Sequence, residues 1–575
     1  MNNLRNCLRN LLFTNHATKV LVGNGGSPNR RETVVIDYSS PNIAKPFHLG
    51  HFRATVTGNF VKNINEAFGH DVIGINYIGD WGTQFDILSS GFSKYGNEGE
   101  LQRNPIEHLY KIYVQANSDI QLLNDGKPLG KIGNENEPVS SAESIVNHIT
   151  EIQSRDTEFW RRVRQTTYEQ LTSNYKRMNI QFTTFEYESD YVEKAYSIVN
   201  QLLANGLAYK SSDGLVCIST ENTSDVNFSK QDIVILKSDK STLYLTRDVA
   251  AAISRYEKYR FDRIHYVVEV GQRLHFQQLN YILLKLGYKW PVLSMIGAND
   301  DDDDDKRANH QSNKCARNLL HVPFGRVIGM STRKGEGLFL LNILDNAQQF
   351  VLNRMKSSQN TRVTQNESTN SLLSQGEIAD HLGVTCLVTT MFTNPRQKPI
   401  NLQTFLGLPV MPTSNSQSLK SSPDGSQLNG LSLQYCHARL CSLESRSISA
   451  GLFEFNVYSG GTSRMYDVNH LIHEYDQFIE WPSATISEKC FMKLADQLCR
   501  YSTVLHIAYS KYEPYYILQY ALQLTSAVNS AWKHLPVLTC SSKEDQLLRL
   551  YIFMASRNVL ASCLRLMGIK PLEAM

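Results

Sequence analysis

Hydrophobic positions near the start of the chain alternate between strand-like runs and a helical repeat. Residues 33–38 (TVVIDY) are β-branched and apolar, which predicts a buried strand. A helical pattern follows over about residues 48–68 and ends at Gly69, where a residue with positive φ favours a helix end. Residues 72–78 (VIGINYI) have the pattern of the next strand. These segments predict a βαβ unit, and parallel sheets bind ligands at the carboxyl ends of their strands.

The pattern becomes mixed after this unit. Residues 89–235 are polar and partly helical, which is consistent with an insertion. Strand signals return at 243–247 (LYLTR) and at 264–270 (IHYVVEV). A helix is predicted over 275–286, and another strand over 321–329 (HVPFGRVIG). This part of the chain is therefore expected to have an α/β fold.

The C-terminal part is predicted to be all helical. Strand signals fade from Gly376 onward, and a long helical pattern over 543–567 is followed by Gly568. An earlier segment places four apolar side chains on one helical face: Leu433, Cys436, Leu440 and Leu443.

The composition is that of a globular protein. The chain has 575 residues, of which 41% are hydrophobic and 20% charged, and this excludes a mostly disordered, collagen-like or coiled-coil protein. We predict no membrane partner, because no uninterrupted apolar run reaches 18 residues. The net charge is +3, and residues 300–305 are all Asp. The rest of the chain is mildly basic, which permits a nucleic-acid partner without requiring one.

No metal centre is predicted. None of the ten cysteines forms a CxxC pair, so a zinc ribbon or a redox dithiol has no support. The Asp run at 300–305 has the pattern of a solvated, self-repelling loop, because a metal site needs ligands held in fixed geometry.

The first candidate chemical cluster is residues 39–51 (SSPNIAKPFHLGH). His48 and His51 lie three residues apart at a predicted helix start, and Gly50 between them lets a flat ligand approach the backbone. A helix N-terminus attracts phosphate, and Lys45 adds a positive charge just before it. The cluster therefore suits charge stabilisation at a phosphate, although two histidines that merely cap a helix would give the same string.

The second cluster is residues 329–337 (GMSTRKGEG), which follow a predicted strand. Two hydroxyls, two basic side chains and several glycines are typical of a loop that closes on a triphosphate. A basic surface hairpin is the alternative interpretation.

These clusters resemble the HIGH and KMSKS signatures of class I aminoacyl-tRNA synthetases, in the same order. The sequence around them is similar to that of arginyl-tRNA synthetases and resembles the mitochondrial form most. The resemblance covers about residues 32–575 and is carried by VVIDYSSPNIAKPFHLGHFRAT, INYIGDWGTQF, LYLTRDVAAA, GQRLHFQQL, HVPFGRVIGMSTRKG, LQYCHARLCSL and the ending RNVLASCLRLMGIKPLEAM.

The resemblance implies an α/β, Rossmann-like class I catalytic domain with an insertion, followed by an all-α anticodon-binding bundle. We place the catalytic domain at 32–375, with the insertion at about 89–235, and the bundle at 376–575. The implied activity is that of an arginine–tRNA ligase, which makes arginyl-adenylate from L-arginine and ATP and transfers the arginine to the terminal adenosine of arginine tRNA. ATP is expected as its Mg²⁺ complex, with no metal bound by the protein itself.

Roles in ATP binding and catalysis follow from the resemblance. The expected catalytic residues are Lys45, His48, His51, Ser331, Arg333 and Lys334. The expected ATP-binding residues are Lys45, His48, Gly50, His51, Met330 and Ser331. Thr332 stands where the class usually has a second lysine, and the resemblance implies that Lys45 compensates for it.

The arginine pocket is also expected from the resemblance, and it maps onto Asp37, Ser40, Asn42, Tyr244, Asp248 and Gln272. A guanidinium has five donors and keeps its charge, so its recognition needs carboxylates. We expect Asp37 and Asp248 to grip the guanidinium, with one further bond from Tyr244. Asn42 and Gln272 would orient the α-amino and carboxylate ends.

The first 31 residues are basic and contain no acid, and their leucines recur at helical spacing. This composition is typical of a mitochondrial transit peptide, and an ordinary frayed terminus is the alternative interpretation. We expect the mitochondrial matrix as the location, with the cytoplasm as the alternative. We also expect a monomer. The resemblance implies a further N-terminal tRNA-binding domain that is missing before Glu32. An RNA-binding pseudo-synthetase is the rival interpretation, and the intact Lys45, His48 and His51 argue against it.

Overall fold

The computed structural model describes a large part of the chain. The described residues are 11, 31–43, 47–124, 157–220, 232–290, 320–328, 340–357, 374–401, 429–452 and 488–575. The basic N-terminal segment, the Asp run and the whole 329–337 cluster lie outside them.

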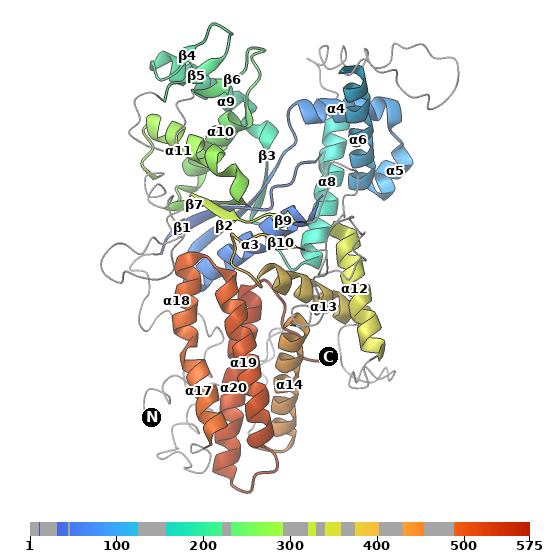
Figure 1. Cartoon of the computed structure of the whole chain (residues 1–575), viewed down its shortest axis with the longest axis vertical. Coiled ribbons are helices and arrows are strands. Elements are labelled where there is room, and N and C mark those ends of the chain that lie inside the picture. Colours follow the sequence, from blue (N-terminus) through green and yellow to red (C-terminus); the bar gives the residue numbers. More distant parts are fainter. Residues whose placement is uncertain are drawn as a thin grey trace, which may run out of the picture.

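A parallel sheet of five strands forms the centre of the described α/β part (Figure 1). Its order is β3-β2-β1-β7-β8, and every neighbouring pair is parallel. The strands are β1 (Thr33–Asp37), β2 (Asp71–Ile78), β3 (Thr184–Tyr187), β7 (Arg263–Glu269) and β8 (His321–Phe324). Because β1 is central, Asp37 at its carboxyl end lies between Ile75 of β2 and Tyr266 of β7.

The two faces of the sheet pack against two different cores. Side chains alternate along a strand, so Val34 and Ile36 of β1 join one core, whereas Val35 joins the other. Helix α3 (Leu49–Ala67) packs on the first face and also contacts the C-terminal helices. The second face is covered by α9 (Val192–Ala204), α10 (Tyr244–Tyr259) and α11 (Arg273–Lys285).

Smaller elements surround the central sheet. A second lobe is built from α4 (Thr83–Tyr95), α5 (Glu98–Arg103), α6 (Pro105–Asn124) and α8 (Thr157–Arg177). An antiparallel sheet contains β4 (Tyr209–Lys210), β5 (Val216–Ile218) and β6 (Ile233–Leu236). A short parallel pair contains β9 (Val327–Ile328) and β10 (Ile400–Asn401). Short 3₁₀ turns occur at η1 (Glu188–Tyr191) and η2 (Val270–Gln272).

Helices make up most of the described C-terminal part. They are α12 (Leu340–Ser357), α13 (Gln375–Met391), α14 (Asn429–Ser449), α17 (Lys489–Cys499), α18 (Tyr501–Lys511), α19 (Pro514–His534) and α20 (Lys543–Leu566). Among the described helices, only α20 is long and apolar enough to cross a membrane, but 83% of its apolar window is buried inside the protein. We therefore interpret α20 as the core helix of the bundle.

Most of the sequence-based predictions for this framework are confirmed. The βαβ unit, the helix at 275–286 and the final helix all form, and the C-terminal helix is followed by Gly568 with φ of 79°. The four apolar residues on one face of α14 are all buried.

Three predictions are corrected by the structure. Residues 243–247 are not a strand: α10 begins at Tyr244, because Leu245, Val249 and the residues after them bury a helical face. The strand expected over 321–329 is divided into β8 and β9. Residues 89–235 are not a simple insertion, because β3 within them pairs with β2 in the central sheet.

Candidate active site

The turn after β1 holds Asp37 in a fixed position. Ser39 and Ser40 have positive φ values of 73° and 43°, which is uncommon for residues with a side chain. The Ser40 backbone N–H donates to Asn76 Oδ1 (3.1 Å), and its hydroxyl donates to Asp37 Oδ1 (2.6 Å). These bonds stabilise a strained turn at the carboxyl edge of the sheet.

The HLGH residues form a reciprocal cap at the start of α3. His48 Nδ1 accepts from the Gly50 N–H (3.0 Å), and His51 Nδ1 accepts from the His48 N–H (3.3 Å). The two rings stack with their centroids 4.1 Å apart. A Cβ at position 50 would lie 2.8 Å from His48 Cε1, so the cap itself requires the glycine. Capping therefore fixes both imidazoles at a helix N-terminus, the position expected for phosphate binding.

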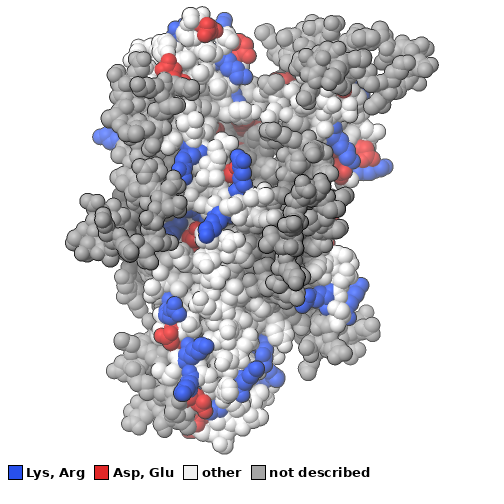
Figure 2. Space-filling model, viewed as in Figure 1, with Lys and Arg blue, Asp and Glu red and all other residues white. Residues whose placement is uncertain are grey.

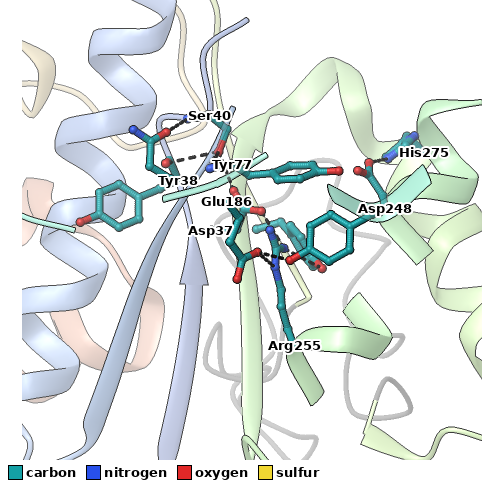
Figure 3. Close-up of polar contacts among 11 residues, drawn as sticks. Asp37, Tyr38, Ser40, Tyr77, Glu186, Asp248, Arg255 and His275 are labelled. Carbon is teal, nitrogen blue, oxygen red and sulfur yellow. Dashed lines mark hydrogen bonds and ion pairs between the residues drawn. The ribbon is translucent and has the colours of Figure 1, made fainter. Parts of the chain in front are cut away.

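A buried ion-pair network lies beneath this edge, as Figure 3 shows. Arg255 donates through Nη1 to Asp37 Oδ2 (2.8 Å) and through Nε to Glu186 Oε2 (2.8 Å). Burial raises the pKa of Asp37, and Arg255 and Ser40 oppose that rise. Burial lowers the pKa of Arg255, but Asp37 and Glu186 outweigh it, so Arg255 stays charged.

Two further acid–base pairs lie at the start of α10. Asp248 Oδ2 and His275 Nε2 are 2.7 Å apart, and both side chains are about one fifth exposed. Arg247 donates through Nε to Glu188 (2.7 Å), and both of these side chains are buried. Burial raises the pKa of Glu188 to about 7, against the opposing effect of Arg247.

The structure places the predicted arginine-binding residues at one edge of the sheet, but their exposure and their hydrogen-bond partners differ. Tyr244, at the start of α10, is 48% exposed, and it lies one helical turn before Asp248. Asn42 forms a bridge with Gly79 and donates to Gln84 (3.0 Å), whereas Gln272 lies in the turn before α11.

The remaining predicted site residues lie outside the described part of the chain: Lys45, Met330, Ser331, Arg333 and Lys334.

The sequence-based prediction missed several side chains at this edge: Tyr77, Glu186, Arg255 and His275. Tyr77 and His275 belong to motifs quoted for the resemblance, so the sequence contained a signal for both. Arg255 and Glu186 had no comparable signal, because each looks like an ordinary charged residue of its element.

Comparisons with known proteins identify the family of this chain. The model for the catalytic domain of class I tRNA synthetases (R) matches residues 16–299, and the DALR anticodon binding domain model matches residues 462–575. The chain is 33% identical to the probable mitochondrial arginine–tRNA ligase of Mus musculus, over 95% of this chain and 79% of the relative. It is 32% identical to the cytoplasmic arginine–tRNA ligase of Saccharomyces cerevisiae, over 94% and 76%. The chain belongs to the arginyl-tRNA synthetase family.

Solved structures support the fold of this synthetase. Arginyl-tRNA synthetase from Plasmodium falciparum has a TM-score of 0.65 at 18% identity, over 100% of this chain and 83% of that one. The Thermus thermophilus arginyl-tRNA synthetase has a TM-score of 0.66 at 17% identity, over 100% and 86%. Both likenesses show the fold alone, and the two family models confirm the predicted class I catalytic domain followed by a helical domain.

The synthetase is therefore an arginine–tRNA ligase, as the sequence predicted. It activates L-arginine with ATP and transfers the arginine to the terminal adenosine of arginine tRNA.

Figure 2 shows one face of the molecule, on which the visible Lys and Arg side chains are scattered over the sheet region and the helical bundle. They are interspersed with acids and do not merge into one basic patch.

Proposed function

We propose that this ligase recognises arginine mainly through Asp248, at the carboxyl edge of the central sheet. The observation that carries the proposal is the position of Asp248, a partly exposed carboxylate that lies one helical turn after the exposed Tyr244 on the same face of α10. Asp37 is close enough for its pKa to respond to the charge of Asp248, but its two oxygens already accept from Ser40 and Arg255.

The positions of the other predicted pocket residues support roles for them in the same site. Ser40 shapes the turn by binding Asp37, and Asn42 and Gln272 flank the edge from the loop after β1 and from the start of α11. We assign these two amides to the α-amino and carboxylate ends of arginine, since amides both donate and accept hydrogen bonds.

ATP is assigned to the start of α3. His48, Gly50 and His51 form the N-terminal turn there, and a helix N-terminus favours phosphate. The flanking residues assigned to ATP and to transition-state charge are Lys45, Met330, Ser331, Arg333 and Lys334. We assign the Mg²⁺ ion to the phosphates of ATP, on which it would arrive. Among the described residues, no three His, Cys, Asp or Glu side chains are grouped to hold a metal ion.

We also propose the domain boundaries 1–31, 32–375 and 376–575, a monomeric state and the mitochondrial matrix as the location. The mitochondrial ligases among the relatives support the location, and the cytoplasmic ligase of Saccharomyces cerevisiae keeps the cytoplasm as the alternative.

The substitution Asp248→Asn tests the arginine assignment. It keeps the shape of the side chain but removes the charge, and a hydrogen bond to a charged group is worth about 1.5–3 kcal/mol. We expect the KM for arginine to rise roughly 10- to 100-fold, with the KM for ATP nearly unchanged. Steady-state ATP–pyrophosphate exchange with each substrate varied in turn measures both constants.

Asp71→Asn is the matched control, because Asp71 lies at the opposite, amino-terminal end of β2 and pairs with Arg31. It should leave both KM values near those of the wild type. Equal changes in the arginine and ATP KM values for Asp248→Asn would remove Asp248 from the arginine pocket.

A further inference from the structure

Tyr77 is an unassigned polar residue at the same edge of the sheet. It is the next-to-last residue of β2, and its side chain extends toward Asp248 in Figure 3. Its Oη atom is buried and has no hydrogen-bond partner among the described residues. Buried phenol oxygens usually have a partner, because an unsatisfied polar group costs stability. The unmatched hydroxyl therefore calls for a functional explanation.

The surroundings of Tyr77 keep its ring in place and its hydroxyl protonated. The Cζ of Arg255 lies 4.9 Å from the ring centroid, and Tyr191 packs edge-on at 5.9 Å. Burial raises the pKa of Tyr77 well above its ordinary value, and the negative charges of Asp248 and Glu188 add to that rise. The phenol is thus neutral and offers one donor and an acceptor oxygen.

We propose that Tyr77 is a further arginine-contact residue, whose hydroxyl accepts a hydrogen bond from the substrate guanidinium and donates one toward Asp248. This inference rests on the proposed arginine pocket around Asp248. A guanidinium has five donors in a rigid fork, so one carboxylate and the Tyr244 hydroxyl leave donors unmatched. A neutral oxygen beside the carboxylate supplies another acceptor without adding charge.

Arg255 acts as a positioning residue in this arrangement. Its guanidinium lies against the Tyr77 ring, and a cation near an aromatic face is attracted to it. Because Asp37 and Glu186 both pair with Arg255, its positive charge is offset and does not repel a second guanidinium in the pocket.

Tyr77→Phe tests the proposal because it removes only the hydroxyl. We expect the arginine KM to rise roughly 5- to 10-fold with an unchanged ATP KM, as for the loss of one neutral hydrogen bond. The thermal midpoint of the substrate-free enzyme should stay equal or rise, because the variant no longer buries an unmatched oxygen. Added arginine should stabilise the variant less than the wild type.

Tyr551→Phe is the control, since Tyr551 is a buried tyrosine of α20 in the helical bundle. It should leave the arginine KM unchanged. An unchanged arginine KM in Tyr77→Phe would overturn the proposal, and so would a lower thermal midpoint without substrate, which would show that the hydroxyl has a structural partner.

The Asp248→Asn variant separates this proposal from the wider assignment. If Asp248→Asn raises the arginine KM and Tyr77→Phe does not, only the role of Tyr77 is wrong. If neither variant changes the arginine KM, the pocket itself lies elsewhere and both proposals are overturned.

Discussion

At the scale of single residues, the sequence predicts the position of Asp37 but not its main partner. Its place at the end of the first strand was predicted from the apolar run before it, and the structure confirms that place. Its main partner was not predictable, because Arg255 is 218 residues further along the chain. Direct contact between Asp37 and the substrate guanidinium therefore stays a prediction, because Asp37 already forms a buried ion pair with Arg255.

Arg255→Met should strongly destabilise the catalytic sheet. It leaves Asp37 and Glu186 buried without their cation, and breaking a buried pair in this way typically costs about 3–5 kcal/mol. A urea titration of the variant against the wild type measures the loss. Adding Asp37→Asn and Glu186→Gln to the variant should recover part of it, whereas a loss below about 1 kcal/mol in the single variant would contradict the role of this network.

At the scale of helices and strands, local periodicity decided which predictions succeeded. The βαβ unit, α11 and α20 have long regular patterns, and each was predicted within a few residues. The strand β3 has only four residues, which is too short for a periodic signal. The first turn of α10 was mistaken for a strand because Tyr and Thr favour strands, and only the buried helical face beyond them reveals the helix.

The packing of α14 predicts a pH dependence of stability. His437 is buried on this helix, with its Nδ1 2.8 Å from the Leu572 carbonyl oxygen, and burial lowers its pKa to about 4. The pKa of histidine in the unfolded chain is about 6.5, so above that pH the ring is neutral in both states and stability is highest. Between pH 6.5 and pH 4 the unfolded chain binds a proton that the folded protein does not. The free energy of unfolding therefore falls by at most about 3 kcal/mol over this range.

Urea titrations at pH 7.5 and pH 5 measure this effect. His437→Gln, whose amide can still donate to Leu572, should lose less stability between the two pH values than the wild type does. An equal loss in both proteins would contradict the assignment to His437.

At the scale of the whole molecule, one buried arginine joins the catalytic part to the helical part. Arg53, two residues after His51, donates to the carbonyl oxygens of Gly325 (2.6 Å) and of Arg396 and Lys398 (both 2.8 Å). The Arg396 backbone N–H donates to the Glu513 carboxylate (2.9 Å) just before α19. The helix that begins with the HLGH residues is thereby connected to the turn before β9 and to the helical bundle.

The account's central claim is that this chain activates arginine at the carboxyl edge of its sheet. Arginine-dependent ATP–pyrophosphate exchange by the purified chain, with and without arginine tRNA, tests that claim most directly. We predict exchange that requires arginine, is not supported by lysine, and is strongest when the tRNA is present. Absence of arginine-dependent exchange under both conditions, or equal exchange with lysine, would contradict it.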